Sequence, residues 1–301
     1  MRSASFVPYQ LSNVILGTAQ LGLDYGVSNK SGLMNSEEAH ALLQAAHLSG
    51  VSILDTAQAY GGSETLIGQH ANSIFQVQTK VGPFPSKELD LSAWLEAQVV
   101  SSQLKLRNQD LNTVFFHDTS QLLGEESRSV RDAVSNLLSN QGDIQIGASL
   151  YDPSEWEAIK KFEEISVYQL PYSLFDTRFE TTGVLEEMIQ MGKKVQARSI
   201  FLQGLLLMNL QDVPKYFDPW RTKLSEFHAF CEDAGILPVG AAAAFVLQNP
   251  SFDGVVIGFH SKNQLIELTS QLSIAQSTTL KFPSFENLSL NVLDPRKWTL
   301  S

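Results

Sequence analysis

The feature that most constrains the fold of this chain is a repeated alternation of short apolar β-type runs with helical runs. Eight strands are expected, at residues 13–16, 51–54, 74–79, 111–116, 144–149, 165–170, 194–197 and 254–257. Helical patterns lie between and after them, at residues 35–50, 64–70, 92–107, 125–138, 155–162, 184–191, 223–234, 240–248 and 263–271. Strict alternation implies a parallel sheet with right-handed crossovers. Eight such units predict an α/β fold, a closed (β/α)8 TIM barrel, rather than an open doubly wound sheet.

No linker or low-complexity segment interrupts this alternation, so we expect one domain over residues 1–301. Its last part, from about 277 to 301, is polar and reads as an irregular tail. No GxGxxG motif follows the first strand, which removes the Rossmann expectation. At the start of the first helix, Ser36 is the expected N-cap, with Glu37 and Glu38 in the first turn.

Composition narrows the classes of partner. The formal net charge is −11 and there is no long basic run, which argues against nucleic acids and anionic membranes as partners. The single cysteine, Cys231, excludes an intrachain disulfide and fits a reducing compartment. No apolar run approaches the length of a membrane span, and the N-terminal residues lack the apolar core of a signal peptide. We therefore expect a cytoplasmic protein.

Four proton-handling residues follow the ends of neighbouring strands. Asp55 and Tyr60 follow the second strand, Lys80 the third and His117 the fourth. The C-terminal ends of barrel strands open onto one face, where catalytic residues of this fold lie. Singly, each residue has an ordinary structural explanation, but all four together predict one site.

The chemistry of these four residues favours protonation of a carbonyl oxygen. A Lys80 ammonium near Tyr60 is expected to pull the tyrosine pKa from about 10 toward neutrality. Asp55 would hold Lys80 charged, and His117 would donate a hydrogen bond to a substrate oxygen. The set lacks a hydride, so a bound cofactor has to supply the electrons.

At this point the sequence resembles the aldo-keto reductase family over nearly its whole length. The resemblance rests on Gly17-Thr18-Ala19, the stretch from Leu54 to Gly61, Thr79-Lys80 and Phe116-His117-Asp118. It implies that Tyr60 is the general acid, assisted by Lys80 and Asp55, and that His117 orients the carbonyl. It also implies a reduced nicotinamide as hydride donor, with NADPH preferred on family grounds and NADH possible.

The same resemblance implies a set of cofactor contacts around the barrel mouth. Expected contacts to the cofactor are Gly17, Thr18, Ala19, Asp55, Ser149, Gln169, Arg198, Ser199, Phe201, Gln203, Gly204, Gly258, His260, Ser261, Lys262 and Gln264. The chain departs from the family pattern where Leu150 follows Ser149 in place of an asparagine, and where Gln264 and Leu268 replace an arginine and an asparagine. Arg198 stands where an aromatic side chain usually stacks on the nicotinamide, and no metal site is expected.

Two other functions remain open from the residues alone. Lys80 could form a Schiff base, as in barrel aldolases. Alternatively, the barrel could be a nicotinamide-binding regulatory or partner subunit with little turnover. Tyr25, Phe84 and Trp220 are candidates for the wall of a substrate pocket. The sequence does not determine which carbonyl compound is the substrate, although a sugar is one candidate. It does not determine the oligomeric state either.

Overall fold

The structure of this chain is a computed structural model that describes residues 9–27, 29, 32–84, 90–107, 109–123, 127–285 and 288–299. Within them, eight parallel strands close into a barrel in sequence order, and β1 pairs with β8. The strands are β1 (Val14–Gly17), β2 (Ile53–Asp55), β3 (Gln76–Val81), β4 (Asp110–Phe116), β5 (Gln145–Ser149), β6 (Ile165–Pro171), β7 (Lys194–Arg198) and β8 (Gly254–Gly258). The predicted TIM barrel is confirmed.

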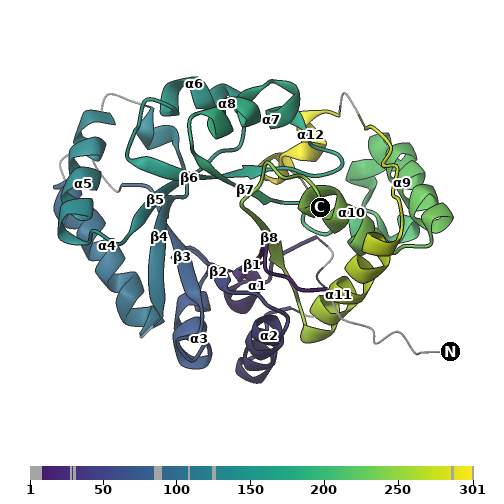
Figure 1. Cartoon of the computed structure of the whole chain (residues 1–301), viewed down its shortest axis with the longest axis horizontal. Coiled ribbons are helices and arrows are strands. Elements are labelled where there is room, and N and C mark those ends of the chain that lie inside the picture. The colour runs from purple at the N-terminus through teal and green to yellow at the C-terminus, as the bar shows by residue number, and fades with distance from the viewer. Residues whose placement is uncertain are drawn as a thin grey trace.

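Helices form a ring around the barrel (Figure 1). The longer ones are α2 (Ser36–Leu48), α3 (Ser63–His70), α4 (Leu91–Leu106), α5 (Ser127–Asn140), α8 (Val184–Gln190), α9 (Arg221–Ala234), α10 (Pro238–Leu247) and α11 (Lys262–Ser277). One-turn helices are α1 (Ala19–Gly22), α6 (Trp156–Ile159), α7 (Arg178–Thr181) and α12 (Leu290–Leu293). Short 3-10 turns lie at Ser120–Leu122, Pro153–Glu155, Leu205–Leu207, Leu210–Asp212, Lys215–Trp220 and Pro295–Lys297.

The start of α2 differs from the expectation by one residue. Asn35, rather than Ser36, is the N-cap: its side chain accepts hydrogen bonds from the backbone N–H groups of Glu37 and Glu38. The Glu38 carboxylate accepts from the backbone N–H of Asn35 in return, which completes a capping box. Both Asn and Ser are good caps, so the sequence left the choice open.

Two further expectations need correction. The helix expected over 155–162 is a 3-10 turn followed by the one-turn helix α6. The tail is more ordered than its polarity suggested, because it contains α12 and buries Phe285, Val292 and Leu293. Residues 125 and 126 of the helix expected over 125–138, and residues 286, 287, 300 and 301 of the tail, lie outside the described residues.

Successive side chains along each strand point alternately to the barrel interior and to the layer under the helices. Leu54, Val77 and Val114 belong to the apolar layer between strands and helices. Inside the barrel, glycines provide room for larger side chains: a Cβ at Gly147 would lie 2.4 Å from the ring of Phe115. The next inward-facing positions toward the C-terminal strand ends are polar. The two-residue period of the strands therefore places polar side chains at the barrel mouth.

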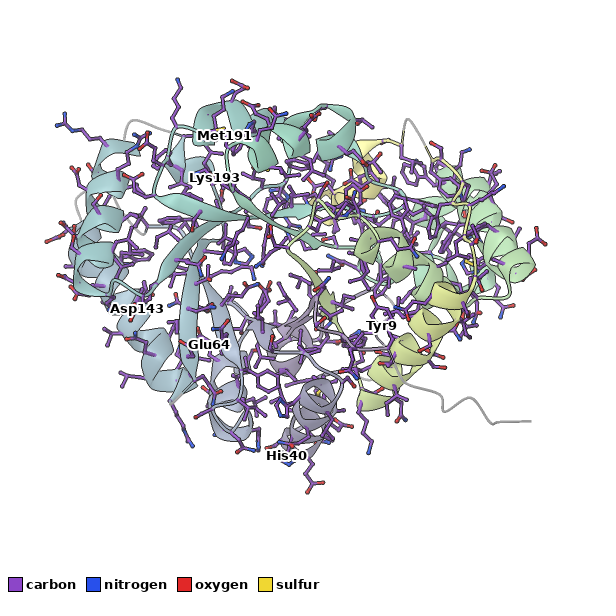
Figure 2. The ribbon with its side chains drawn as sticks, viewed as in Figure 1. Tyr9, His40, Glu64, Asp143, Met191 and Lys193 are labelled. Carbon is purple, nitrogen blue, oxygen red and sulfur yellow. The ribbon has the colours of Figure 1, made fainter. Side chains whose placement is uncertain are left out.

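Buried polar groups also lie outside the barrel interior. Glu64, on α3, lies between the barrel strands and the surrounding helices (Figure 2). Its carboxylate accepts a hydrogen bond from Thr79 Oγ1 at 2.8 Å and pairs with Lys105 Nζ at 3.2 Å. Glu64 is thus satisfied as a structural residue.

Among the residues that the structure describes, no single helix is long and apolar enough to cross a membrane. Two consecutive segments, Lys215–Ala234 and Pro238–Leu247, are together long and apolar enough, but the chain bends by 92° between them.

Candidate active site

The inward-facing side chains at the strand ends open onto a cavity of about 840 Å³. Asp55, Tyr60, Lys80 and His117 all line it. Such a volume is within the range of small-molecule and cofactor sites. The four residues predicted at the ends of three neighbouring strands are therefore brought together.

Asp55 and Lys80 form a buried ion pair in the floor of the cavity. Lys80 Nζ lies 2.5 Å from Asp55 Oδ2, and the two side chains are 3% and 5% exposed. Lys80 also donates to the backbone oxygen of Thr56 at 3.1 Å. Burial lowers the pKa of Lys80, and the Asp55 carboxylate offsets part of this effect. The Lys80 ammonium is thus held by both the Asp55 carboxylate and the backbone oxygen of Thr56.

The second oxygen of Asp55 is held by a cluster of glutamine amides in the barrel interior. Asp55 Oδ1 accepts hydrogen bonds from Gln169 Nε2 at 2.6 Å and Gln78 Nε2 at 2.9 Å. Gln196 Oε1 accepts from the same two amides, and Gln196 Nε2 donates back to Gln78 Oε1. Gln78 and Gln196 were not predicted, although each lies two residues before a predicted site residue and therefore on the same strand face.

The loop that carries Tyr60 is fixed by close backbone packing. A Cβ at Gly22 would lie 1.8 Å from the backbone oxygen of Tyr60, and Gly61 has φ +54°. Only residues without a side chain allow these two loops to approach so closely. The Tyr60 ring is therefore positioned by Gly22 and Gly61.

Tyr60 faces His117 and Lys80 across the cavity. The Tyr60 and His117 rings are perpendicular, with centroids 5.9 Å apart. Lys80 Nζ lies 5.5 Å from the centroid of the Tyr60 ring. The Tyr60 hydroxyl makes no hydrogen bond to any described residue, so its proton is available to a ligand.

The expected lowering of the Tyr60 pKa is wrong for this structure. Burial raises the pKa of Tyr60, and the Asp55 carboxylate adds to the rise, while Arg198 opposes it. The positive charge of Lys80 is largely neutralised by Asp55, which explains why it does not dominate. Tyr60 is consequently a phenol, and not a phenolate, at neutral pH.

His117 is neutral in the same range of pH. Burial lowers its pKa to about 4, and the Lys80 charge adds to this shift. A neutral imidazole has one N–H donor and one acceptor nitrogen. His117 can therefore donate a hydrogen bond while it carries no charge.

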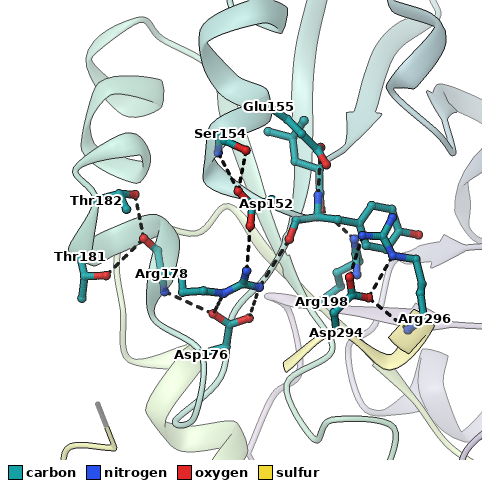
Figure 3. A network of polar contacts seen from close by, with 12 residues as sticks. Asp152, Ser154, Glu155, Asp176, Arg178, Thr181, Thr182, Arg198, Asp294 and Arg296 are labelled. Atoms are coloured by element: carbon teal, nitrogen blue, oxygen red, sulfur yellow. Dashed lines mark hydrogen bonds and ion pairs between the residues drawn. The ribbon is translucent and has the colours of Figure 1, made fainter. Parts of the chain in front are cut away.

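Arg198 and a residue from the tail share one aromatic ring. The Arg198 guanidinium carbon lies 4.2 Å from the centroid of the Tyr151 ring, and that of Arg296 lies 3.7 Å from it. Arg198 also donates to Ser149 Oγ, Ser199 Oγ and the backbone oxygen of Leu150. Figure 3 shows Arg198, Arg296 and Asp294 together at this place. Here Arg198 stacks on a protein ring.

Loops after β1 and β7 meet across the cavity. The backbone N–H of Val27 donates to the backbone oxygen of Gln203 at 3.1 Å. Ser199, Leu202 and Gln203 all have positive φ, a conformation that non-glycine residues seldom adopt. Such strained backbone is common in ligand-binding loops.

Most of the predicted cofactor contacts line the cavity, and two do not. The cavity-lining ones are Gly17, Thr18, Ala19, Asp55, Ser149, Gln169, Arg198, Ser199, Phe201, Gln203, Gly204, Gly258, His260 and Gln264. Ser261 and Lys262 lie outside the lining: Ser261 caps α11 by accepting from the N–H of Gln264, and Lys262 is exposed. Among the pocket aromatics, Tyr25 lines the cavity, whereas Phe84 packs on Trp94 and Trp220 lies beside Tyr216.

Several lining residues were not predicted. They include Gln20, Tyr151, His228, Pro295 and Arg296. Tyr151 lies two residues past the end of β5, a position that the strand-end rule makes a candidate. His228 and Arg296 come from a helix and from the tail, where no sequence pattern points to the cavity.

The residues present fit a nicotinamide. Gln169 is fully buried, its NH2 group is occupied by Asp55 and Gln196, and its Oε1 has no partner among the described residues. A buried unpaired carbonyl oxygen is unfavourable unless a ligand donates to it. A carboxamide N–H is such a donor, and Ser149 beside it carries a hydroxyl.

Comparison with known proteins identifies the family. A family model described as the aldo/keto reductase family matches residues 13–288. The chain belongs to the aldo-keto reductase family. Family and fold together support an oxidoreductase that reduces carbonyl compounds.

A solved structure from Pseudomonas aeruginosa, described as a candidate aldo-keto reductase, is similar in fold to this family member. The TM-score is 0.63 at 20% sequence identity, over 91% of this chain and 100% of that one. At this identity the likeness concerns the fold. None of the curated proteins matches the sequence.

Proposed function

We propose that this protein reduces an aldehyde or ketone to an alcohol with NADPH or NADH, and that Tyr60 is the general acid. One observation carries the proposal: Tyr60 lines the cavity with its ring close to His117 and Lys80, and its hydroxyl makes no hydrogen bond to the described residues. The family resemblance supports NADPH as the first cofactor to test.

The four residues would divide the work as follows. The hydride for the carbonyl carbon would come from a reduced nicotinamide held beside these residues. Tyr60 donates its phenolic proton to the carbonyl oxygen as negative charge develops there. His117, being neutral, donates a hydrogen bond to the same oxygen and orients the carbonyl. Lys80, fixed by Asp55, stabilises the phenolate that Tyr60 becomes.

The raised pKa of Tyr60 is compatible with this role. A tyrosine with a high pKa keeps its proton until the acceptor oxygen is more basic than a phenolate. The alkoxide that forms after hydride addition meets this condition, whereas the ground-state carbonyl does not. Proton transfer is thereby coupled to reduction.

Residues around the cavity would hold the nicotinamide end of the cofactor. Gln169 Oε1 would accept a hydrogen bond from the carboxamide, and Ser149 would contribute its hydroxyl. Arg198 would present its guanidinium plane beside the ring. Gln264 lines the cavity at the position where the family pattern has an arginine. The choice between NADPH and NADH therefore has to be determined by measurement.

The decisive experiment combines cofactor binding with a tyrosine variant. Fluorescence titration with NADPH and NADH identifies the tighter cofactor, which is then used to screen aldehydes, ketones and sugars. Tyr60→Phe is expected to lower kcat by about 10²–10⁴-fold with little change in cofactor affinity. Tyr9→Phe is the matched control, because Tyr9 is half-buried and does not line the cavity.

Other outcomes would favour the rival functions. Unchanged reduction by Tyr60→Phe would overturn the general-acid role. Cofactor binding without reduction of any carbonyl would favour a regulatory or partner subunit. Covalent labelling of Lys80 by borohydride and a carbonyl compound would favour a Schiff-base aldolase.

A further inference from the structure

The wall of the cavity next to the predicted general acid contains a stack of two arginines on one tyrosine. Arg198 reaches Tyr151 from β7, and Arg296 reaches it from the 3-10 turn Pro295–Lys297 near the C-terminus. All three side chains line the cavity. Guanidinium groups stack well on aromatic rings, but two of them on one ring also repel each other.

The charges that line the cavity are unequally distributed. Asp55 and Lys80 neutralise each other. Arg198 makes no ion pair with any carboxylate of the described residues. Glu267, the other acidic residue of the lining, lies on α11 after β8, whereas Tyr151 follows β5 across the barrel. Around Tyr151, the lining is therefore positive, although the chain carries a formal net charge of −11.

Asp294 orients Arg296 without occupying all of its donors. The Asp294 carboxylate accepts from Arg296 Nε at 2.9 Å and from one terminal nitrogen at 2.8 Å. The other terminal nitrogen of Arg296 makes no hydrogen bond to the described residues. The side chain is 55% exposed, and Asp294 does not line the cavity. One edge of the guanidinium is thus presented to a ligand.

The segment that carries Arg296 is anchored on both sides. Val292 and Leu293 are buried, and Trp298 packs on Phe217 with ring centroids 4.8 Å apart. Tyr216 donates its hydroxyl proton to the backbone oxygen of Asn291 at 3.0 Å. A fixed guanidinium loses less entropy on binding an anion than a free side chain does.

From these contacts we infer that the substrate carries an anionic group, a carboxylate or a phosphate, which Arg296 binds at the wall formed with Tyr151 and Arg198. The inference rests on the proposed carbonyl reduction and adds the class of substrate to it. Arginine suits this role because its planar fork matches the oxygens of carboxylate and phosphate groups.

Matched pairs of carbonyl compounds test the inference. One pair is 4-carboxybenzaldehyde and its methyl ester, methyl 4-formylbenzoate, which differ in charge but share the aldehyde. The other is glyceraldehyde 3-phosphate and glyceraldehyde. For at least one pair, kcat/KM is expected to be about tenfold higher for the charged member, as one charge-assisted hydrogen bond provides. The pair that shows the preference identifies the anion as carboxylate or phosphate.

Two variants locate the preference. Arg296→Gln is expected to reduce the charged-to-neutral ratio about tenfold, while Arg296→Lys, which keeps the charge, retains part of it. Arg131→Gln is the matched control, because Arg131 packs 4.2 Å from the Phe162 ring and does not line the cavity. It should leave the ratio unchanged. About 0.5 M salt should narrow the preference of the wild type, since Arg296 is exposed.

The outcomes separate this inference from the proposed function. Equal rates for both members of both pairs, or a preference that survives Arg296→Gln, would overturn the inference and leave carbonyl reduction intact. Absence of all reduction would overturn the proposed function. Calorimetric binding of two alcohol pairs would then decide the inference: 4-(hydroxymethyl)benzoate with its methyl ester, and glycerol 3-phosphate with glycerol. Tighter binding of at least one anion by wild type, lost in Arg296→Gln, supports it, and equal binding within both pairs refutes it.

Discussion

Two ion-pair networks that each contain a buried carboxylate lie near the C-terminal ends of the barrel strands, and they differ in which polar groups they leave without a partner. In the first, Asp55 and Lys80 line the cavity beside Tyr60. In the second, Arg178 bridges Asp176 and Asp152 outside the cavity (Figure 3). Both bury charge, but among the described residues the first adjoins a side-chain atom without a partner, Gln169 Oε1.

The Arg178 network is complete within the protein. Arg178 Nε and one terminal nitrogen donate to the two oxygens of Asp176, each at 2.8 Å, and the other donates to Asp152 Oδ2 at 3.2 Å. Asp152 also accepts from the backbone N–H of Ser154 and starts the turn before α6. Every strong donor is matched, so this network links β6 and α7 to the loop after β5.

The hydrogen bonds of the Asp55 network are complete inside the barrel but not where the network meets the cavity. Asp55 accepts hydrogen bonds from Lys80, Gln78 and Gln169. Gln169 Oε1, by contrast, is buried without a partner among the described residues, and the Tyr60 hydroxyl at the cavity makes no hydrogen bond to them. Unsatisfied groups at a cavity cost stability unless a ligand binds them. The difference fits the proposed role of the Asp55 network in binding and chemistry, and a structural role for the Arg178 network.

Lys80→Met tests the first half of this comparison and should have the largest effect. Without the ammonium, the phenolate of Tyr60 is not stabilised, and kcat should fall by about 10²–10⁴-fold. Lys105→Met is the matched control, because Lys105 pairs with the buried Glu64 away from the cavity. The rates are compared per folded molecule, with folding checked by circular dichroism. Equal losses in both variants would contradict the assignment.

Arg178→Met tests the second half. It would leave the Asp176 carboxylate, 1% exposed, without its two guanidinium donors. Removal of one partner of a buried pair costs about 3–5 kcal/mol, so the free energy of unfolding in urea should fall by that amount. Turnover per folded molecule should stay within about twofold of wild type.

An exposed pair provides the reference for that loss. Lys223 and Glu226 lie 3.1 Å apart with side chains 42% and 49% exposed. Lys223→Met should change the free energy of unfolding by less than about 1 kcal/mol. A loss in Arg178→Met no larger than this would show that the network does not stabilise the fold.

The barrel and the convergence of Asp55, Tyr60, Lys80 and His117 could be predicted from sequence for a simple reason. Strand period and βα alternation determine which residues reach the mouth, and both are local patterns. The same rule would mark Gln78 and Gln196 as inward-facing residues, although neither was predicted, and nothing local indicates that their amides bond to Asp55 or to each other. Pairing inside a barrel depends on side chains from opposite strands.

Two features had no local signal at all. Arg296 lies far beyond the last strand, and its place beside Tyr151 depends on how the tail packs across the mouth. The rise in the Tyr60 pKa depends on its burial and on the neutralisation of Lys80 by Asp55, both properties of the assembled site. Contacts between residues close in sequence can be predicted from local patterns. Burial of a side chain by segments distant in sequence cannot.

The cavity residues and the Arg178 network should also make the stability of the fold depend on pH in different ranges. A histidine in the unfolded chain binds a proton below about pH 6.5, whereas His117 in the folded protein does so only below about pH 4. Between these values protonation favours the unfolded chain, so the free energy of unfolding should fall by about 2–3 kcal/mol as pH decreases. His228 and His260, whose pKa values burial also lowers, act in the same direction.

The Arg178 network should respond at lower pH. Burial alone would raise the pKa of Asp152, but hydrogen bonds from Ser154 and the Arg178 charge outweigh it, and the pKa is lowered. A carboxylate with a lowered pKa stabilises the fold above about pH 4, and this contribution is lost as pH falls further. Urea unfolding from pH 7 to 3 measures both ranges. His117→Gln should flatten the curve between pH 6.5 and 4, and Asp152→Asn should flatten it below pH 4. If His117→Gln left the upper range unchanged, the burial of a neutral imidazole at the cavity would not be what makes the folded protein sensitive to mild acid.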